Sequence, residues 1–352
     1  MAVAEESEKL TPERPPVCSV CIANYNGRDV IDACINSVIN QDCGYPFEII
    51  IHDDASTDES ADYIAAHYPQ LKLIRSDRNV GYCISNNRMA AQAWGRYLLL
   101  LNNDATLYPD ALRALHTKAT RESGPVILTL PQYNAETGTL VDRGLRLDPF
   151  LNPVPNLDPT RTEVSSVHGA CLWVPSGLWH EIGGFPEWFH MLAEDLYLCC
   201  EARLRGAKVM VTPRSGYRHR IGYSIGGGKV QGTHLATTFR RRALSERNKT
   251  FVMTICYPSP ILWLMLPLHM LLLLTEGLLL SAIRLDSRIL SGIYIFALRG
   301  VFAHRRQLRE HRRAVQRRRT ITRLAFFETF NPLPHKLIML WRYGLPRIRE
   351  SP

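Results

Sequence analysis

The run Phe47-Glu-Ile-Ile-Ile-His-Asp-Asp54 decides the fold class of this 352-residue chain. Its apolar core is too short for a helix and is typical of a strand that is buried on both faces. Two other runs have the same form: Val17 to Ala23 precedes Asn24-Tyr25-Asn26, and Tyr97 to Leu101 precedes Asn102-Asn103-Asp104. Helical stretches separate the three runs. Strands that alternate with helices predict an α/β fold with a doubly wound, mostly parallel sheet.

The polar residues that follow these strands are the first candidates for a binding site. In an open α/β sheet the ligand binds at the edge formed by the carboxyl ends of the strands. Asp53 follows three isoleucines, where an acid without a partner is costly. We therefore predict that Asp53 accepts hydrogen bonds from the base or ribose of a nucleotide, whereas Ser56 and Asp58 are expected only to cap the next helix. The other expected ligand contacts at this edge are Asn24, Tyr25, Asn26 and Asn103.

Asp104 is the predicted metal ligand. Mg²⁺ and Mn²⁺ prefer hard oxygen ligands, and few carboxylates suffice when ligand phosphates complete the coordination. His219 could add a neutral imidazole to the same metal. A surface histidine beside arginines explains His219 equally well.

Glu194-Asp195 opens a helix expected to run to Arg205. Acids at a helix N-terminus are stabilised by the helix dipole, which is one explanation of the pair. The other is a general base that removes a proton from an acceptor hydroxyl. Three aromatic residues precede the pair and could stack on a sugar ring, namely Phe185, Trp188 and Phe189.

A turn and a polar helix start are expected at Asn79-Val-Gly81-Tyr82 and Asn86-Asn87. Asn79, Gly81 and Asn86 either face a nucleotide or only shape the fold. Residues 131–164 contain several Pro, Gly and Asp residues and are expected to form a loop.

Seven short motifs occur in a characteristic order along the first two thirds of the chain. They are Val20 to Gly27, Asp53 to Ser60, Asn79-x-Gly81-Tyr82-x-x-x-Asn86-Asn87, Leu100-Leu-Asn102-Asn-Asp104, Gly183-Gly-Phe185, Glu194-Asp195 and His219-x-x-Gly222-x-Ser224. In this order they resemble the family 2 glycosyltransferases, most closely the rhamnosyltransferase-like branch with a GT-A fold. The resemblance covers roughly Pro16 to Asn248.

The resemblance implies an inverting transfer of a sugar from a nucleoside-diphosphate donor. It implies that Asp53 holds the base or ribose, that Asp104 holds the divalent cation (Mg²⁺ or Mn²⁺) at the diphosphate, and that His219 is a further ligand. Asp195 would be the catalytic base, with Glu194 supporting it. The family's common D-x-D motif is Asn102-Asn103-Asp104 here, so metal binding depends on one carboxylate.

The C-terminal third has a different character. Residues 261–283 are long and apolar enough to cross a membrane, but they include Pro267, His269 and Glu276, and basic residues flank both ends. Both ends therefore favour the cytoplasm. We expect a helical hairpin, an interfacial anchor or a single span, with a buried helix as the alternative.

The arginines between Arg305 and Arg319 are expected to lie on anionic lipid headgroups. Such an anchor suits a glycan or lipid-linked acceptor. The expected division is a disordered tail over 1–15, a GT-A domain over 16–233 and a helical membrane-associating region over 234–352, which begins with a basic helix at 234–255. No apolar signal segment begins the chain, so we expect the protein at the cytoplasmic face of the cell membrane.

Composition argues against several other classes of protein. The net charge of +9 could indicate nucleic-acid binding, but no aromatic residue lies among the arginines between His304 and Thr320, so we expect no nucleic acid partner. A dinucleotide-dependent oxidoreductase would need G-x-G-x-x-G after the first strand. The residues there are Asn24-Tyr-Asn-Gly-Arg-Asp29, which do not match this motif. The C-x-x-C of Cys18 and Cys21 falls on a strand whose alternate faces separate the two thiols, so it predicts no zinc site. A sugar-phosphate nucleotidyltransferase or another nucleotide-sugar-binding protein remains the alternative function.

Overall fold

A computed structural model of the chain describes residues 15–222, 230–231 and 234–350. The tail expected to be disordered therefore lies almost wholly outside the described residues. So do Ser224 of the last motif and most of the glycine-rich segment around it.

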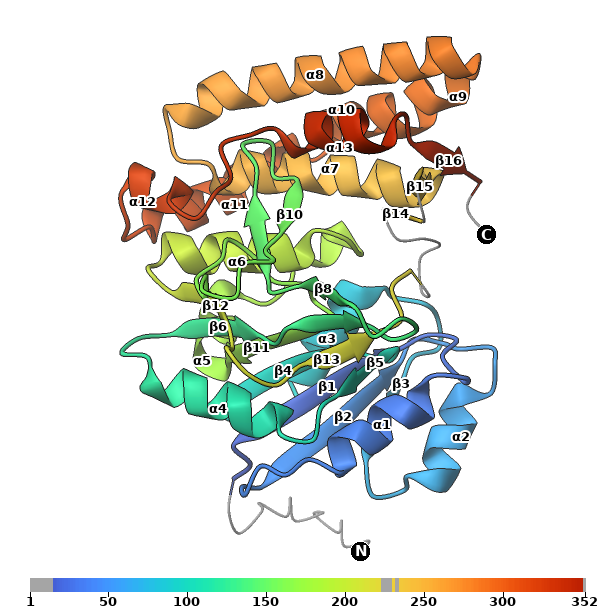
Figure 1. Cartoon of the computed structure of the whole chain (residues 1–352), viewed down its shortest axis with the longest axis vertical. Coiled ribbons are helices and arrows are strands. Elements are labelled where there is room, and N and C mark those ends of the chain that lie inside the picture. Colours follow the sequence, from blue (N-terminus) through green and yellow to red (C-terminus); the bar gives the residue numbers. More distant parts are fainter. Residues whose placement is uncertain (1–14, 223–229, 232–233, 351–352) are drawn as a thin grey trace, which may run out of the picture.

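A seven-stranded sheet forms the centre of the N-terminal part of the chain (Figure 1). The strand order is β12-β6-β11-β4-β1-β2-β3, and only β11 runs antiparallel to its neighbours. The mostly parallel α/β sheet predicted from the alternation of strands and helices is thus confirmed. The strands are β1 (Cys18–Asn24), β2 (Phe47–Asp53), β3 (Lys72–Arg75), β4 (Tyr97–Asn102), β6 (Val126–Thr129), β11 (Cys171–Pro175) and β12 (Lys208–Val211).

Helices cover both faces of this sheet. One hydrophobic core joins the sheet to α1 (Ile31–Ile39), α2 (Ser60–His67) and α4 (Ala111–Arg121). The other joins it to α3 (Tyr82–Ala90), α5 (Ser176–Ile182) and α6 (Glu194–Leu204). Cys18 lies in the first core and Cys21 in the second, as the alternation of side chains along β1 predicts.

The segment expected to be a loop over 131–164 contains four short strands, so that prediction was wrong. They are β7 (Gln132–Asn134), β8 (Leu140–Asp142), β9 (Leu145–Leu147) and β10 (Pro153–Pro155). Strands of three residues are too short to show an alternating pattern, and the turn residues between them dominate the composition. Together with β5 (Ala105–Leu107) and β13 (Tyr217–His219), β7 and β8 form a second sheet in the order β5-β13-β7-β8.

The C-terminal region is helical and packs beyond α6 (Figure 1). The basic helix expected from residue 234 begins instead at Phe239, because His234–Thr238 forms a strand, β15, which pairs in parallel with β16 near the end of the chain. The side chain of Thr238 then caps the helix. The elements are β14 (Val230–Gln231), α7 (Phe239–Cys256), α8 (Ile261–Arg284), α9 (Ser287–Ile289), a π-helical stretch (Leu290–Ile295), α10 (Phe296–Ala303), α11 (Arg305–Arg317), α12 (Arg323–Phe327), α13 (His335–Tyr343) and β16 (Arg347–Arg349).

Helix α7 packs in the core of the sheet-containing part as well as in the C-terminal region. Its residues Phe251, Met253 and Cys256 lie in the same core as Leu198 and Cys200 of α6. The division of the chain at residue 233 stays a prediction, and the packing makes the two parts continuous.

Helix α8 is long and apolar enough to cross a membrane, the one such helix among the described residues. It lies along the edge of the molecule farthest from α1 and α2 (Figure 1). Its two ionisable side chains before the final arginine, His269 and Glu276, contact Thr250 and Arg242 of α7. The opposite face is apolar and exposed, at Trp263, Leu264, Leu271 and Leu278.

Candidate active site

Three neighbouring strands end at one edge of the central sheet. Asn24 at the end of β1 is in register with Asp53 at the end of β2, and Ala23 is in register with Asn102 at the end of β4. The apolar runs end together because each strand leaves the core at this edge. The register of the three strands therefore brings the polar residues together at this edge, as predicted.

Asn24 links the ends of these strands through its buried side chain. Its Nδ2 donates to Asp53 Oδ2 at 2.8 Å and to Ser60 Oγ at 2.9 Å, and its Oδ1 accepts from Asn103 Nδ2 at 2.8 Å. A Cβ on Gly27 would lie 2.4 Å from Asn24 Oδ1 and 2.2 Å from Asn103 Nδ2. The turn after β1 must therefore carry glycine, and Asn24 and Asn103 are fixed by contacts within the protein.

Asp53 is 2% exposed, and both of its carboxylate oxygens accept hydrogen bonds from Ser56. Ser56 was expected only to cap α2, which was wrong: it holds Asp53, and its Oγ also accepts from Asn26 N at 2.9 Å. Asp58 accepts from Ser60 N at 3.1 Å, as expected near a helix start. The contact of Asp53 with a nucleotide stays a prediction. Within the protein, its carboxylate holds Asn24 and Ser56 at this edge of the sheet.

The turn after β1 leaves one side chain available for a ligand. Asn26 has a positive φ of 48°, and its Oδ1 accepts from Thr57 N at 2.8 Å. The neighbouring side chain of Tyr25 is half-exposed. The ring of Tyr25 therefore lies at the edge of the sheet, where a base or a sugar could stack on it.

Asp54 shapes the Asn79–Gly81 turn, a role that sequence reasoning missed. Its carboxylate is buried and accepts from the backbone N–H groups of Val80 at 2.7 Å and Gly81 at 2.8 Å. Gly81 has a φ of +93°, and a Cβ there would lie 2.2 Å from the ring of His190. Glycine at this position therefore lets the 190–193 loop pack on the turn.

The two asparagines of this motif lie in different environments. Asn79 is exposed. Asn86 is 1% exposed, and its Nδ2 donates to Tyr82 O at 2.9 Å within α3. The contacts of Asn86 thus favour the fold-shaping explanation, while Asn79 remains free to reach a ligand.

Asp104 and His219 come together across β5 and β13, where Ala105 is in register with His219. His219 Nε2 lies 3.1 Å from Asp104 Oδ1, and the two side chains are 14% and 2% exposed. Within the described part of the chain, no group of three or more His, Cys, Asp and Glu residues could hold a metal. One carboxylate and one imidazole fit a divalent cation whose remaining ligands come from a diphosphate and water.

A second acid–histidine pair, which sequence reasoning also missed, lies beside the first. Asp142 at the end of β8 is 3% exposed, and its Oδ2 lies 3.7 Å from His168 Nε2. Burial holds the pKa of Asp142 above its ordinary value, although the nearby imidazoles of His168 and His219 act in the opposite direction. Because Asp142 lies in the segment expected to be a loop, no pattern in the sequence indicated this pair.

The segment 168–170 connects Asp195 to the strand edge. Asp195 Oδ2 accepts from Gly169 N at 3.0 Å, and Ala170 O accepts from Asn102 N at 3.1 Å. Tyr82 OH donates to Gly169 O at 3.0 Å. The acid at the start of α6 and the end of β4 therefore border one site, with His168 on the same segment.

Glu194 differs from Asp195 in its surroundings. It is 6% exposed, and burial together with repulsion from Asp195 raises its pKa. The carboxyl group of Glu194 therefore stays protonated to a higher pH than that of an exposed glutamate.

The loop before this pair is held from α7. Asn248 Nδ2 lies 3.1 Å from Phe189 O, 2.9 Å from Met191 O and 2.8 Å from Leu192 O. Phe185, Trp188 and Phe189 were considered as residues that could stack on a sugar ring, but their packing does not favour this. Phe185 and Phe189 are fully buried, and Trp188 packs on the aromatic ring of Phe251 and on histidines of the C-terminal helices.

Comparison with known proteins identifies the family of the N-terminal part of the chain. Residues 19–172 match the family described as glycosyl transferase family 2. These residues form a family 2 glycosyltransferase domain. The match includes Asp53 and Asp104, whereas Glu194, Asp195 and His219 lie beyond it.

Two curated relatives of this domain have named roles. The succinoglycan biosynthesis protein ExoO of Rhizobium meliloti is 30% identical over 136 residues, which cover 38% of each chain. The N-acetylglucosaminyl-diphospho-decaprenol L-rhamnosyltransferase of Mycobacterium tuberculosis is 25% identical over 221 residues, 54% of this chain and 71% of the relative. The matches cover only 31–38% of the length of the first three curated relatives.

Solved structures share the GT-A fold of this family 2 domain. The structure of S. aureus TarS residues 1–349 with UDP-GlcNAc has a TM-score of 0.55 at 17% identity, covering 86% of this chain and 88% of that one. The mannosyltransferase PcManGT from Pyrobaculum calidifontis with GDP-Man and Mn²⁺ has a TM-score of 0.50 at 17% identity, covering 86% of each chain. At this identity the likeness concerns the fold alone.

Proposed function

We propose that this family 2 protein is an inverting glycosyltransferase that moves a sugar from a nucleoside-diphosphate donor to a glycan or lipid-linked acceptor in cell-surface polysaccharide assembly. The observation that carries the proposal is the segment 168–170. It contacts the acid at the start of α6 on one side and the strand edge on the other. An acceptor and a donor can therefore meet between Asp195 and the ends of β1, β2 and β4.

The donor binds at the strand edge. Tyr25 offers an exposed ring to the base or sugar, and Asn24, Asp53 and Asn103 keep the edge rigid through their mutual hydrogen bonds. Asp104 and His219 hold the divalent cation, Mg²⁺ or Mn²⁺, which when bound neutralises charge on the departing diphosphate. The PcManGT neighbour, which was solved with GDP-Man and Mn²⁺, supports a divalent cation beside the donor but does not identify its ligands in this chain.

Asp195 removes the proton from the acceptor hydroxyl. Its carboxylate is oriented by the backbone N–H groups of Gly169 at 3.0 Å and Leu196 at 2.7 Å. Glu194 supports it as a neutral acid, because burial raises the pKa of Glu194. Attack from the side of the sugar opposite the diphosphate inverts the anomeric centre. Rhamnose is the proposed sugar, on the likeness to the mycobacterial rhamnosyltransferase.

We propose that the C-terminal region holds the enzyme at the cytoplasmic face of the cell membrane. The inward contacts of His269 and Glu276 leave α8 with a continuous apolar outer face. A helix with this pattern lies in the membrane interface with its apolar side in the lipid. Most of the arginines of α11 are exposed and would contact anionic headgroups, except Arg312, which donates to Thr254 O at 2.9 Å and Tyr257 O at 2.7 Å.

The direct test is donor-dependent release of nucleoside diphosphate by the purified full chain, after a screen of nucleotide-sugars by thermal shift. We expect Asp195→Asn to abolish transfer and to keep donor binding. Asp62→Asn, which removes an exposed acid on α2, should transfer sugar at the wild-type rate. Full activity of Asp195→Asn would refute the base. Release of pyrophosphate from a nucleoside triphosphate would instead indicate the nucleotidyltransferase alternative.

Membrane binding is tested by flotation with vesicles that contain anionic phospholipid. Leu264→Asp and Leu271→Asp place charges on the exposed face of α8 and should reduce the floated fraction. Leu157→Asp changes an exposed leucine of the catalytic part and should float as the wild type does. Equal flotation of all variants would argue against α8 as the membrane contact.

A further inference from the structure

The C-terminal region contains a cavity of about 690 Å³ that lies apart from the candidate active site. Its walls come from β15, α7, α8 and α13 and from the chain that follows α13. This volume is in the range of small-molecule binding sites. Nothing in the proposed reaction uses it.

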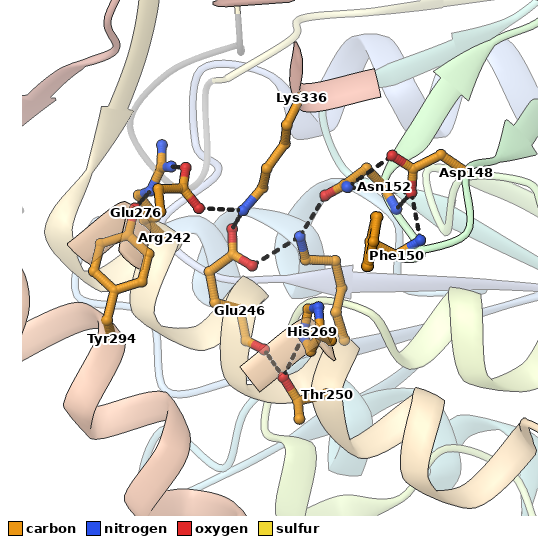
Figure 2. A network of polar contacts seen from close by, with 11 residues as sticks. Asp148, Phe150, Asn152, Arg242, Glu246, Thr250, His269, Glu276, Tyr294 and Lys336 are labelled. Atoms are coloured by element: carbon orange, nitrogen blue, oxygen red, sulfur yellow. Dashed lines mark hydrogen bonds and ion pairs between the residues drawn. The ribbon is translucent and has the colours of Figure 1, made fainter. Parts of the chain in front are cut away.

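The floor of the cavity is a network of ion pairs (Figure 2). Glu246 lies 3.0 Å from Lys249 and 2.7 Å from Lys336, and Glu276 lies 2.5 Å from Arg242 and 2.8 Å from Lys336. These three cations neutralise both carboxylates that line the cavity. Asp148 lies behind the floor, and its carboxylate accepts from Asn152 and from the backbone of residues 150, 152 and 335.

Arg241 adds a fourth cation to the lining. Among the described residues, no carboxylate lies within ion-pair distance of its guanidinium. Burial lowers the pKa of Arg241, with no neighbouring acid to oppose the effect. A partly buried guanidinium is costly without an anion, and here none of the described residues supplies one to Arg241.

The walls and mouth of the cavity are apolar. Leu273 and Leu280 of α8 are buried beside the floor. Toward the outside, the lining side chains become exposed, and these are Leu272, Leu279, Ile283, Leu337 and Leu340. The mouth therefore opens beside the exposed apolar face of α8, where the membrane would lie.

We propose that this cavity binds one lipid molecule that carries a phosphate group, with the phosphate at Arg241 and the hydrocarbon chain between α8 and α13. A nucleotide-sugar would place hydroxyl groups against the leucines. A neutral hydrocarbon would leave Arg241 without an anion. A guanidinium binds phosphate through paired, charge-assisted hydrogen bonds. The proposal is independent of the donor and of the reaction proposed above.

Binding is measured as the unfolding midpoint of the full chain in dodecyl maltoside, titrated with dioctanoyl phosphatidic acid. We expect saturable stabilisation. Dioctanoylglycerol and inorganic phosphate, which each lack half of the ligand, should stabilise the protein far less. Geranylgeranyl phosphate in a parallel titration distinguishes an isoprenoid carrier from a bilayer phospholipid, because the natural class should bind with the lower Kd.

Two variants test the location. Arg241→Gln should weaken binding of the phosphatidic acid about tenfold, the loss typical of a charge-assisted hydrogen bond. Ser245→Phe fills the cavity without changing its charge and should abolish binding. Arg240→Gln, an exposed neighbour outside the lining, should bind as the wild type does. Equal stabilisation by dioctanoylglycerol or by phosphate alone would overturn the proposal, as would wild-type affinity in both cavity variants.

Discussion

Replacing Asn248 by alanine should damage the active site without touching a substrate. Asn248 is fully buried, and its two N–H hydrogens serve three carbonyl oxygens at 2.8–3.1 Å. Phe189 O also accepts from Met191 N at 2.8 Å, so alanine leaves chiefly the carbonyls of Met191 and Leu192 without a donor. An unsatisfied buried group costs about 1–3 kcal/mol. Because two hydrogens are shared among three acceptors, we expect Asn248→Ala to lower the free energy of unfolding by about 2–4 kcal/mol.

The same change should reduce kcat more than donor affinity. The loop that Asn248 holds includes Leu192 and Ala193 at φ values of 70° and 64°, a conformation that surrounding contacts must maintain. The loop leads directly into Glu194 and Asp195. A displacement of about 1 Å in a catalytic group costs on the order of 100-fold in rate. The strand edge that binds the donor is unchanged.

The assay compares kcat, donor affinity and urea unfolding of Asn248→Ala with those of Asn40→Ala. Asn40 is exposed, and its Nδ2 donates to a single carbonyl in α1, so the control should match the wild type in all three measurements. Wild-type kcat in Asn248→Ala would refute the argument. An equal loss of donor affinity and kcat would also refute it, because the effect would then not be specific to the base.

Three further outcomes are expected. Gly81→Ala should unfold at a lower temperature than Gly44→Ala in thermal melts. Both glycines have a positive φ (+93° and +73°), but only a Cβ at Gly81 would contact another residue, His190. The backbone strain of Gly44→Ala alone should cost about 1–2 kcal/mol. For Glu194→Gln, the raised folded-state pKa means that the unfolded chain loses its proton first, so the wild type loses stability as pH rises above the ordinary value of 4.5. The stability gain of the variant should therefore grow from pH 5 towards neutral pH, and a constant difference across this range would contradict the assignment. Asp104→Ala should remove the cation dependence of donor binding in titrations with and without EDTA, and cation-dependent binding in this variant would exclude Asp104 as the ligand.

The sequence predicted the sheet and its polar edge because the signals are local. Three isoleucines followed by His52 and Asp53 indicate both a buried strand and its end, and the leucines before Asn102-Asn103-Asp104 do the same. The resemblance implied that Asp104 and His219 share a ligand, but the adjacency of β5 and β13 that brings them together is seen only in the structure. These parts of the site depend on chemistry within a few residues of a strand.

Other parts of the site depend on contacts between distant segments. Asp142 and His168 lie in or next to a segment of turns and three-residue strands, where no periodicity exists to detect. Asn248 lies in a helix recognisable mainly by its charges, and its role appears only when α7 packs against the 189–192 loop. Ser56 is a residue type that commonly caps helices, but here its hydroxyl donates a hydrogen bond to the carboxylate of Asp53.

Helix α7 lines the lipid cavity on one side and holds the 189–192 loop, which leads to the proposed catalytic base Asp195, on the other. Glu246 and Lys249 face the ion pairs, whereas Asn248 between them faces the carbonyls before Glu194. A helix is stiff over this length, so a tilt on one side is mechanically transmitted to the other. Thermodynamic linkage then requires reciprocity: if an occupant of the cavity tightened donor binding, the donor would tighten retention of that occupant by the same factor.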